Sequence, residues 1–413
     1  MKVLVVGSGG RCHAIVDKIS QSKLVKEIYC APGNDGMREL CNLVDISATD
    51  VDKLLEFALE NKIDLTIVGP EVALEKGIVD VFRAHNLKIF GPTKAAARIE
   101  TSKEFAKELM KKYNIPTASF KTFTDYEKAC AYVDEKGAPI VIKYDGLAAG
   151  KGVVVANTIE EAKQALKDML LDEKFGNDDK VVIEEYLEGP EFSFMCMVDN
   201  DKVYPLPLSQ DHKRALDNDK GGNTGGMGAY SPLKFITSDD FLYSLDRIMK
   251  PVANALVKEG CPFTGILYGG LMKTENGIKV IEFNARFGDP ETEVILPRLE
   301  NDLVQSILNI LDHKDPEIIV SNDTTIGIVM ASNGYPASYN KMYSLELDKI
   351  AGKVYYMGVK EVEGKLYTNG GRVLIIVEKA ADLATARALA LEDVKHVHCS
   401  NLFYRTDIGH WSL

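Results

Sequence analysis

Short apolar runs, separated by glycine turns and helical patterns, mark the N-terminal part of the chain. The runs cover residues 2–6, Glu27–Cys30, Asp64–Val68 and Lys88–Phe90. The first run leads into Gly7-Ser8-Gly9-Gly10, and a helical pattern then extends to about Ile19. Repetition of strand, loop and helix is typical of a parallel α/β layer. Because such sheets bind ligands at the carboxyl ends of their strands, we expect a ligand near these glycine turns.

A second unit is predicted to begin near residue 101. Thr101, followed by Glu104 three residues later, fits a capping box at the start of a helix. Strand patterns cover Ile140–Lys143, Val153–Ala156 and Val181–Glu185. Thr158 opens a further helix with acidic residues in its first turn, where they favour helix formation. From residue 191 to about 325 the predicted elements are longer.

A third unit is predicted over residues 326–413. It has strand patterns near 326–331, 353–359 and 372–377, and a helical pattern near 382–396. The chain of 413 residues is long enough for several domains of ordinary size. The sequence therefore predicts three domains, at residues 1–101, 102–325 and 326–413.

Segment 281–291 has the most informative pattern in the chain. Polar Glu282, Asn284 and Arg286 alternate with apolar residues, and in a strand alternate residues share one face. That face would carry a carboxylate, an amide oxygen and a guanidinium. Oxygen ligands suit Mg²⁺, and a guanidinium fork suits phosphate oxygens. The pattern favours a metal–nucleotide phosphate site, with a solvated amphipathic strand as the alternative.

Composition narrows the classes of function. The net charge of −12 argues against a nucleic-acid binder that works by phosphate neutralisation. No run of about 18 apolar residues is present, so we expect no membrane span. Seven cysteines are scattered without a C-x-x-C pair, which indicates reduced thiols and a cytoplasmic protein.

The first glycine turn is not a dinucleotide-binding motif. The third glycine of G-x-G-x-x-G would fall at Cys12, and the second strand ends in Cys30-Ala31-Pro32 without an acid for a ribose. Backbone N–H groups at this turn, together with Arg11, could hold a phosphate monoester. A purely structural turn is the alternative.

A second glycine-rich segment lies between Lys143 and Lys151. It is not a Walker A loop, because three residues rather than four separate Gly146 from Gly150, and Gly152 follows the lysine. Small residues let a loop close over phosphates, and lysines supply point charges. A plain hairpin turn is the alternative.

Two more segments suit a nucleotide and its co-substrate. Glu184–Leu187, followed by Glu191, suits a hinge whose backbone meets a base and whose carboxylate takes ribose hydroxyls, although acidic strand ends are usually just solvated. Gln210–Arg214 and Gly221–Tyr230 combine charge with many small residues, which is unfavourable in backbone entropy unless the loop grips a ligand. A mobile surface loop is the alternative.

Together these motifs resemble the glycinamide ribonucleotide synthetase family of the ATP-grasp superfamily. The resembling segments occur in family order over nearly the whole chain: 7–11, 31–34, 69–71, 145–153, 210–214, 223–232, 282–291 and 370–372. The pair Gln-Asp-His-Lys-Arg and Asn-Thr-Gly-Gly-Met-Gly-Ala-Tyr is the most specific part. The resemblance implies an α/β fold with an N-terminal parallel-sheet (pre-ATP-grasp) domain, an ATP-grasp domain whose lid spans about 122–190, and a small C-terminal α+β domain.

The resemblance also implies a role for each matching residue. Of the parts of ATP, the phosphates would contact Lys103 and Lys143. Adenine would contact Glu184, Glu185, Tyr186 and Leu187, and the ribose would contact Glu191. Arg214 and Asn223 would also line the nucleotide site. Mg²⁺ (or Mn²⁺) would bind Glu282 and Asn284, and Lys143, Lys151 and Arg286 would be catalytic. The region for 5-phosphoribosylamine would contain Gly9, Gly10, Arg11, Asn34 and Glu71. Glycine would face Asp211, Thr224, Gly225, Gly226 and Met227.

Several positions depart from the family pattern. Cys12 and Tyr144 stand where the family usually has Glu and Ala, Gly222 replaces a Pro, and the C-terminal residues 410–413 are unusual. The missing carboxylate at Cys12 could alter the pocket of the amine substrate. None of the departures falls on the implied metal or lysine positions.

The implied reaction agrees with the chemistry of the residues. Glycine's carboxylate is ionised at pH 7 and can attack the γ-phosphate of ATP without a general base, so catalysis needs alignment and charge neutralisation. The implied partners are small molecules, with no nucleic acid, no membrane and a monomeric chain. An ATP-grasp ligase for another amine and a nucleotide-dependent binding protein are the alternatives.

Overall fold

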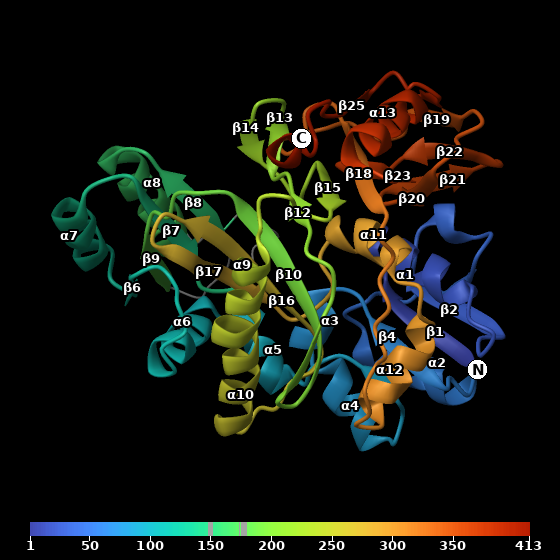
Figure 1. Ribbon diagram of the computed structural model, residues 1–413, viewed down its shortest axis with the longest axis horizontal. Helices are drawn as coiled ribbons and strands as arrows, with labels where there is room; N and C mark the ends of the chain where they lie inside the picture. The colour runs from blue at the N-terminus through green and yellow to red at the C-terminus, as the bar shows by residue number, and fades with distance from the viewer. Residues whose placement is uncertain (148–151, 173, 175–179) are drawn as a thin grey trace.

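The structure is a computed structural model, and it describes residues 1–147, 152–172, 174 and 180–413. The N-terminal part is a parallel sheet of five strands in the order β3-β2-β1-β4-β5 (Figure 1). Its strands are β1 (Lys2–Gly7), β2 (Glu27–Pro32), β3 (Asn42–Leu43), β4 (Leu65–Val68) and β5 (Ile89–Phe90). The helical elements are α1 (Gly10–Ser20), η1 (Asp35–Met37), α2 (Val51–Glu60), α3 (Glu71–Glu75), α4 (Ile78–Ala84) and α5 (Lys94–Thr101). The predicted parallel α/β layer is confirmed; β3 was not predicted because two residues carry no pattern.

Strand β1 is apolar throughout because both of its faces are covered. Leu4 belongs to the same core as Leu54 of α2 and Phe82 of α4. Val3, on the other face, belongs to the core that contains Ile15 of α1. A parallel strand buried on both sides reads as a continuous apolar run rather than an alternating one.

The predicted helix start at Thr101 is wrong by one residue. Thr101 is the last residue of α5, and Ser102 caps α6 (Lys103–Lys112) by accepting a hydrogen bond of 3.1 Å from the backbone N–H of Phe105. Serine performs the same capping chemistry as threonine. The amphipathic pattern of α5, with Ile99 buried, carries that helix through Thr101.

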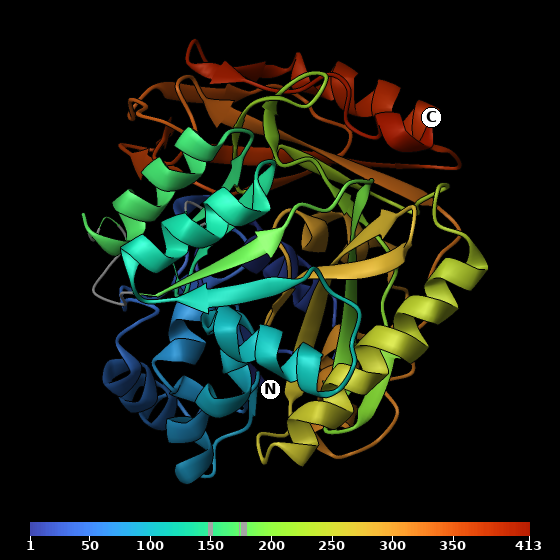
Figure 2. The same cartoon turned by 90° about the vertical axis from the view of Figure 1, so that its left-hand side faces the viewer.

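A second, antiparallel sheet has the order β6-β9-β7-β8. Its strands are β6 (Phe120–Phe123), β7 (Ile140–Tyr144), β8 (Val153–Ala156) and β9 (Val181–Glu185), and it is covered by α7 (Tyr126–Lys136) and α8 (Ile159–Leu170), which lie side by side (Figure 2). Thr158 caps α8 as expected. Ile142, Leu166 and Ile183 belong to a core separate from the rest of the molecule, so this sheet forms a unit of its own.

A third sheet, in the order β11-β10-β16-β17, lies beside it. Its strands are β10 (Glu191–Asp199), β11 (Lys202–Pro205), β16 (Thr264–Thr274) and β17 (Gly277–Asn284). The helical elements of this part are α9 (Ser238–Ser244), η2 (Leu245–Met249), α10 (Lys250–Lys258), α11 (Glu291–Ile295), η3 (Leu296–Arg298) and α12 (Leu303–Leu311). Thr117 bridges to Val280 of β17, which joins the start of the second sheet to the edge of the third.

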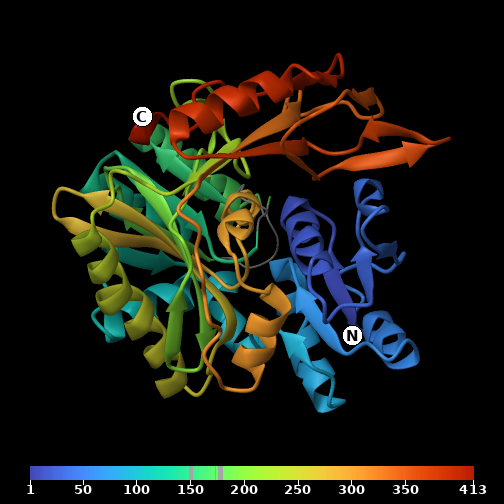
Figure 3. The same cartoon turned by 45° about the vertical axis from the view of Figure 1, so that its right-hand side comes forward.

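The C-terminal part lies over both the N-terminal sheet and the middle of the molecule (Figure 3). Its main sheet follows β12-β15-β18-β23-β20, with β25 also paired to β18. These strands are β12 (Gln210–Asp211), β15 (Gly228–Ser231), β18 (Thr324–Ser332), β20 (Lys353–Tyr356), β23 (Arg372–Ala380) and β25 (Leu402–Phe403). The other elements of this part are β19 (Ser344–Leu347), β21 (Val359–Val362), β22 (Lys365–Thr368), β24 (Val397–His398), α13 (Leu383–Val394) and η4 (His410–Ser412). In the middle of the chain, β13 (Arg214–Leu216) and β14 (Lys220–Asn223) form a separate two-stranded sheet.

The single strand predicted near 353–359 is two strands. β20 ends at Tyr356 and β21 begins at Val359, in a different sheet. The chain turns at Gly358, where an added Cβ would lie 2.7 Å from the Cα of Gly370, so only glycine permits the close approach. None of the described helices is long and apolar enough to cross a membrane.

Candidate active site

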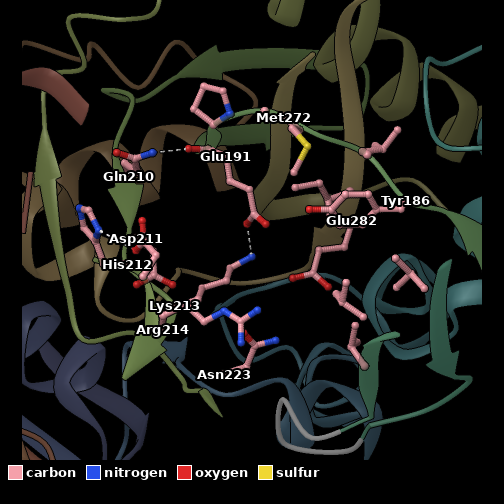
Figure 4. A pocket seen from close by; sticks show the side chains of 18 of the residues that line it. Tyr186, Glu191, Gln210, Asp211, His212, Lys213, Arg214, Asn223, Met272 and Glu282 are labelled. Carbon is pink, nitrogen blue, oxygen red and sulfur yellow. Dashed lines mark hydrogen bonds and ion pairs between the residues drawn. The ribbon is translucent and has the colours of Figure 1, made fainter. Parts of the chain in front are cut away.

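Two adjoining hollows lie where the second sheet faces β17. The larger, of about 410 Å³, is lined by the end of β9, the start of β10 and residues of β12 to β14 (Figure 4). The smaller, of about 170 Å³, is lined by residues of α5, α6 and β17, and by Glu71. The two hollows share Lys143, Val153, Glu184, Ile281 and Glu282.

Strand β17 supplies the polar face predicted from segment 281–291. Glu282, Phe283 and Asn284 all line the smaller hollow, and Phe283 and Asn284 are also buried. Glu282 pairs with Gly270 while Val280 pairs with Leu271, so Ile281 is an extra residue in this strand. Such a bulge re-aims the side chains that follow it. Glu282 and Asn284 alternate within β17 as predicted, but the strand ends at Asn284, so Arg286 lies outside it. The bulge at Ile281 is an irregularity that the sequence did not indicate.

Arg286 follows the strand and is already held by carboxylates. Its guanidinium lies 2.9 Å from Glu100 and 3.2 Å from Glu71, and it donates to the Oδ1 of Asn284 at 3.2 Å. Burial alone would lower the pKa of Arg286, but Glu100 and Glu71 outweigh burial and raise it. Arg286 is therefore a fixed positive charge beside Asn284.

Lys143 lies at the centre of the site. Its Nζ is 2.9 Å from the Oε1 of Glu184 and donates to the carbonyl of Ile281 at 3.0 Å. Lys107, which sequence reasoning missed, holds the other oxygen of Glu184 at 2.8 Å. Burial lowers the pKa of Lys107 to about 8. The spacing of Lys103 and Lys107, four residues apart on α6, was the signal that could have found it.

Lys103 and the glycine-rich hairpin meet at Asp145. The backbone N–H of Lys103 donates to Asp145 at 2.6 Å, and its Nζ donates to the carbonyl of Gly146 at 3.0 Å. Burial, with Lys143 nearby, lowers the pKa of Lys103. β7 and β8, which flank the glycine-rich segment, pair in antiparallel fashion. Lys151 lies outside the described residues.

Glu282 is the carboxylate that fits a divalent cation. Burial would raise its pKa, but Lys213, Lys143 and further cations outweigh burial and lower it, so the carboxylate is ionised. Within the part of the chain that the structure describes, no hydrogen bond or ion pair occupies it, and Asn284 on the same face offers an amide oxygen. Oxygen donors of this kind fit Mg²⁺. No group of three or more His, Cys, Asp or Glu side chains that could hold a metal exists among the described residues, so a cation here would need ligand oxygens as well.

Glu191 and Lys213 form a pair across the larger hollow. Their Oε2 and Nζ atoms lie 2.6 Å apart, and the amide of Gln210 donates to the backbone carbonyl of Glu191 at 2.7 Å (Figure 4). Burial would lower the pKa of Lys213, but Glu191 and Glu282 outweigh burial and raise it. Lys213 lies within the motif Gln210–Arg214, but the sequence did not predict it as a site residue.

The predicted hinge follows β9 along the larger hollow. Tyr186 and Leu187 lie beyond the end of the strand and line the hollow. Glu184 and Glu185 are still within the strand, and the carboxylate of Glu185 accepts from the backbone N–H of Ser119 at 3.2 Å. The Glu184 side chain is paired with Lys107 and Lys143. Of the four predicted hinge residues, Tyr186 and Leu187 are therefore the two that extend past the strand along the hollow.

Arg214 and Asn223 lie opposite each other in the β13–β14 pair. Both line the larger hollow, and both are exposed. Arg214 donates to the carbonyl of Gly221 at 2.9 Å, which closes the hairpin. The structure therefore brings these two predicted residues to the same wall.

The predicted glycine region surrounds Asp211. Asp211 is enclosed, and its Oδ1 has no hydrogen-bond partner within the described chain. Burial, with Glu291 nearby, raises the pKa of Asp211 well above its usual range. Gly226 has φ +115°, and a Cβ there would lie 2.4 Å from the Oδ1 of Asp211, so the loop needs glycine at this point.

The remaining residues of that loop are tied to the backbone. Thr224 donates to the carbonyl of Lys213 at 2.8 Å, and Gly225 accepts from Arg372 at 2.8 Å. Met227 is fully buried and lines neither hollow. Its side chain therefore packs in the core. Of the rest of the predicted set, Asp211 and Thr224 line the larger hollow, whereas Gly225 and Gly226 line neither.

In the predicted phosphoribosylamine region, a carboxylate from a distant segment lies against the glycine turn. The backbone N–H of Arg11 donates to Asp289 at 3.1 Å, and a Cβ on Gly9 would lie 3.2 Å from the same carboxylate. A Cβ on Gly10 would lie 2.3 Å from Glu293, so α1 approaches α11 very closely. Asp289 was missed because its 278-residue separation from Arg11 leaves no local signal.

Glu71 links this region to the strand β17 face. It lies 4.0 Å from Arg11 and 3.2 Å from Arg286. Burial would raise its pKa, but Arg286 and Arg11 outweigh burial and lower it to about 2. Asn34 instead ties loops together, donating to the carbonyls of Ser8 at 2.6 Å and Tyr356 at 3.0 Å.

Cys12 does not open into either hollow. Its sulfur lies within 2.4 Å of the place where a Cβ would sit on Gly7 or Gly69, so it fills a gap between two loops. Burial raises its pKa to about 12. The departure at this position changes packing beneath the glycine turn. Tyr144 is likewise buried, at the end of β7.

This arrangement of a nucleotide-sized hollow between two sheets defines an ATP-grasp protein. The fold is similar to a biotin carboxylase from Campylobacter jejuni (TM-score 0.77, 16% identity, 100% of this chain and 94% of the other). The ATP-grasp (A) domain model of phosphoribosylglycinamide synthetase matches residues 101–292, the N domain model matches 1–100 and the C domain model matches 325–411. The chain belongs to the phosphoribosylglycinamide synthetase family.

Relatives and a solved structure agree over the full length. The chain is 53% identical to the phosphoribosylamine–glycine ligase of Halalkalibacterium halodurans, over 99% of this chain and 96% of the relative. It is 52% identical to that of Streptococcus pneumoniae, over 99% of each. The crystal structure of the Thermotoga maritima phosphoribosylamine–glycine ligase is similar at a TM-score of 0.88 and 32% identity, over 99% of this chain and 100% of the other.

Proposed function

We propose that this chain joins glycine to 5-phosphoribosylamine in an ATP-dependent reaction, giving glycinamide ribonucleotide, ADP and phosphate for purine biosynthesis. Its membership of the phosphoribosylglycinamide synthetase family and its relatives' names support this activity. The observation that carries the site assignment is Glu282, an ionised carboxylate beside Asn284 at a hollow ringed by lysines.

ATP would lie along the larger hollow. Tyr186 and Leu187 would meet adenine through their backbone, with Glu184 and Glu185 supporting this wall from β9. Glu191 would take the ribose hydroxyls, and Lys213, missed in the sequence, would hold that carboxylate in place.

Arg214 and Asn223 would close the nucleotide site at the β13–β14 wall. Lys103 and Lys143 would neutralise the phosphates at the lysine-rich end, and Lys151 is proposed for the same role from the family pattern. Lysines suit this task because they are compact point charges that reach phosphate oxygens from several directions.

A divalent cation, Mg²⁺ or Mn²⁺, would be held by Glu282 and Asn284 together with phosphate oxygens. When bound, it neutralises charge on the phosphates and orients them. Arg286 adds a fixed positive charge next to Asn284, held in place by Glu100.

The reaction would proceed in two steps without a protein nucleophile. The carboxylate oxygen of glycine forms a bond to the γ-phosphorus while the bond from that phosphorus to the β,γ-bridging oxygen breaks, giving glycyl phosphate and ADP. The amine of phosphoribosylamine then attacks the acyl carbon, phosphate leaves with the electron pair, and the amine proton passes to phosphate or solvent. The chain's residues align the reactants and exclude water from the acyl phosphate.

Glycine would bind at Asp211. The Oδ1 of that carboxylate lacks a partner in the described chain, and the ammonium group of glycine would supply one. Such an ammonium would also favour the ionised carboxylate. The backbone of residues 224–226 would shape the pocket; the buried Met227 would support it from below.

Phosphoribosylamine would bind near Gly9, Gly10, Arg11 and Glu71, with Asn34 holding the surrounding loops. Arg11 is the natural partner for its phosphate. Glu71 connects this substrate to Arg286 and so to the phosphate-transfer end of the site.

The test is ADP release from the purified protein with ATP, Mg²⁺, glycine and freshly made phosphoribosylamine, each omitted in turn. We expect release to require all of them, and to fall when glycine is replaced by other amino acids. Equal release with another acid–amine pair would favour a different ATP-grasp ligase. ATP binding with no ADP release under any condition would instead favour a binding protein. We further propose a cytoplasmic monomer that acts on small molecules and engages neither nucleic acid nor membrane.

A further inference from the structure

The last turn of the chain, η4, lies against the larger hollow. Trp411 is among the residues that line this hollow, and 48% of its surface is exposed. It is also the one tryptophan in the sequence. A large indole exposed at the wall of a ligand-sized hollow is poised to be covered by a ligand.

The residues on either side of Trp411 are anchored in the protein. The Oγ of Ser412 lies 2.9 Å from the hydroxyl of Tyr230 and accepts from the backbone N–H of Lys234 at 3.1 Å. The backbone N–H of Gly409 donates to the Nε2 of His212 at 2.9 Å. Chain termini are poorly ordered unless they are tied down in this way. Trp411 is therefore held at its position rather than on a loose end.

A row of rings locates Trp411 relative to the nucleotide residues. Ring centroids are 5.2 Å apart between His212 and His410, 5.5 Å between His410 and Trp411, and 6.5 Å between Trp411 and Phe235. His212 directly precedes Lys213, whose ammonium holds Glu191. Trp411 thus lies on the side of the hollow that carries Glu191, where the ribose is proposed to bind.

The chemistry of this wall differs from that of the opposite end. Lys103 and Lys107 line the smaller hollow beyond Lys143, and they suit phosphates. An indole offers a flat apolar surface and an N–H donor, which suit a purine ring or a sugar. The uncharged indole of Trp411 offers no electrostatic attraction to phosphates.

We propose that Trp411 is a further binding residue, which contacts the nucleoside portion of ATP and not its phosphates. The proposal deepens the proposed function and rests on it, because it takes ATP as the occupant of this hollow. The closing turn of the C-terminal part thereby completes the nucleotide site of the middle part.

The first experiment follows the fluorescence of the unmodified protein. Because the chain has a single tryptophan, its emission reports on Trp411 alone. We expect ATP to change the emission saturably, while sodium tripolyphosphate, which has phosphates but no nucleoside, leaves it unchanged. No change with ATP at concentrations where calorimetry shows binding would overturn the proposal, and so would an equal change with tripolyphosphate.

The second experiment compares Trp411→Ala with Trp411→Phe. Loss of one aromatic contact with a nucleoside should raise the KM for ATP about tenfold, while the KM for glycine stays unchanged. Phenylalanine keeps an aromatic face and should restore most of the affinity. Leu413→Ala is the matched control, since Leu413 is also exposed at the terminus but does not line the hollow.

The outcomes separate the two proposals. An unchanged KM for ATP in Trp411→Ala, or equal rises for ATP and glycine, would refute the role of Trp411 while the ligase activity of the unmodified protein stands. Absence of ADP release from the unmodified protein would refute the proposed function; the fluorescence titration would still test the contact, because it requires no turnover.

Discussion

Two charged regions of this molecule contain similar numbers of acids and bases but use them differently. Around the two hollows, four lysines, at 103, 107, 143 and 213, face Glu184, Glu191 and Glu282. Beneath the N-terminal glycine turn, three arginines, at 11, 286 and 372, face Glu71, Glu100 and Asp289. This second region adjoins the first, because Glu71, Glu100 and Arg286 also line the smaller hollow.

In the second region, the three named carboxylates are each paired with an arginine. Asp289 is held by Arg372 at 3.0 Å and by the backbone of Arg11, and Glu71 is held by Arg286. In the lysine region, by contrast, Glu282 has no such partner among the described residues, and its neighbours are cations. Among the described residues, the lysine region thus leaves Glu282 without a partner, whereas the arginine region pairs Glu71 and Asp289 with arginines.

The largest effect is expected at Glu282. Glu282→Gln keeps the shape of the side chain but removes the charge that would hold a cation, so turnover should fall about 100- to 1,000-fold. Steady-state ADP release at saturating Mg²⁺ measures it, with circular dichroism to confirm the fold. Glu275→Gln, on the exposed β16–β17 turn, is the control. Turnover near normal in Glu282→Gln would contradict the assigned role.

Glu71 tests whether the arginine region is structural. Its folded-state pKa of about 2, against an ordinary 4.5, contributes stability that is present above pH 4.5 and is lost as the pH falls toward 2. Glu71→Gln should therefore lower the free energy of unfolding by at most about 3 kcal/mol at pH 7. The difference in the free energy of unfolding between the variant and the unmodified protein should shrink below pH 4.5. Urea unfolding at several pH values measures it.

Glu75→Gln, at the other end of helix α3, is the control and should leave stability unchanged. A difference in the free energy of unfolding between Glu71→Gln and the unmodified protein that stays constant from pH 7 down to about pH 2 would mean that the two arginines do not stabilise this carboxylate.

Gly10 tests the close packing of that same region. An added Cβ would lie 2.3 Å from Glu293, so Gly10→Ala should destabilise the protein by about 1–3 kcal/mol and raise the KM for phosphoribosylamine more than that for ATP. Thermal unfolding and steady-state kinetics measure the two effects. Gly9→Ala meets its neighbour at 3.2 Å and should be milder. Equal losses in the two variants would refute the packing argument.

Lys213 should give the smallest effect. Lys213→Met removes the 2.6 Å partner of Glu191 and should raise the KM for ATP about tenfold with little change in the KM for phosphoribosylamine. Lys202→Met, exposed on β11, is the control. A larger rise in the KM for phosphoribosylamine than in the KM for ATP would mean that Lys213 does not belong to the proposed ATP site.

Local patterns predicted most of the individual elements. The apolar runs gave β1, β2, β4 and β5 within a residue or two, and alternation in segment 281–291 placed Glu282 and Asn284 on one face. The errors were local as well. Ser102 rather than Thr101 caps α6, since both residues satisfy the same chemistry, and the strand near 353–359 breaks at Gly358, where another chain segment approaches.

Long-range partners could not be predicted. Lys107 and Lys143 both bind Glu184, and Asp289 binds the backbone of Arg11, but the sequence gives no register between such distant segments. The same holds for Trp411, which lines the larger hollow because its turn is anchored to Tyr230 and His212.

By itself, the sequence determined which residues could do chemistry and which faces of their strands and helices they share, because spacing along one element fixes direction. Only the tertiary structure decided which charges are already paired, and which, like Glu282, are left for a ligand. That difference depends on burial and on contacts between elements, which no local pattern encodes.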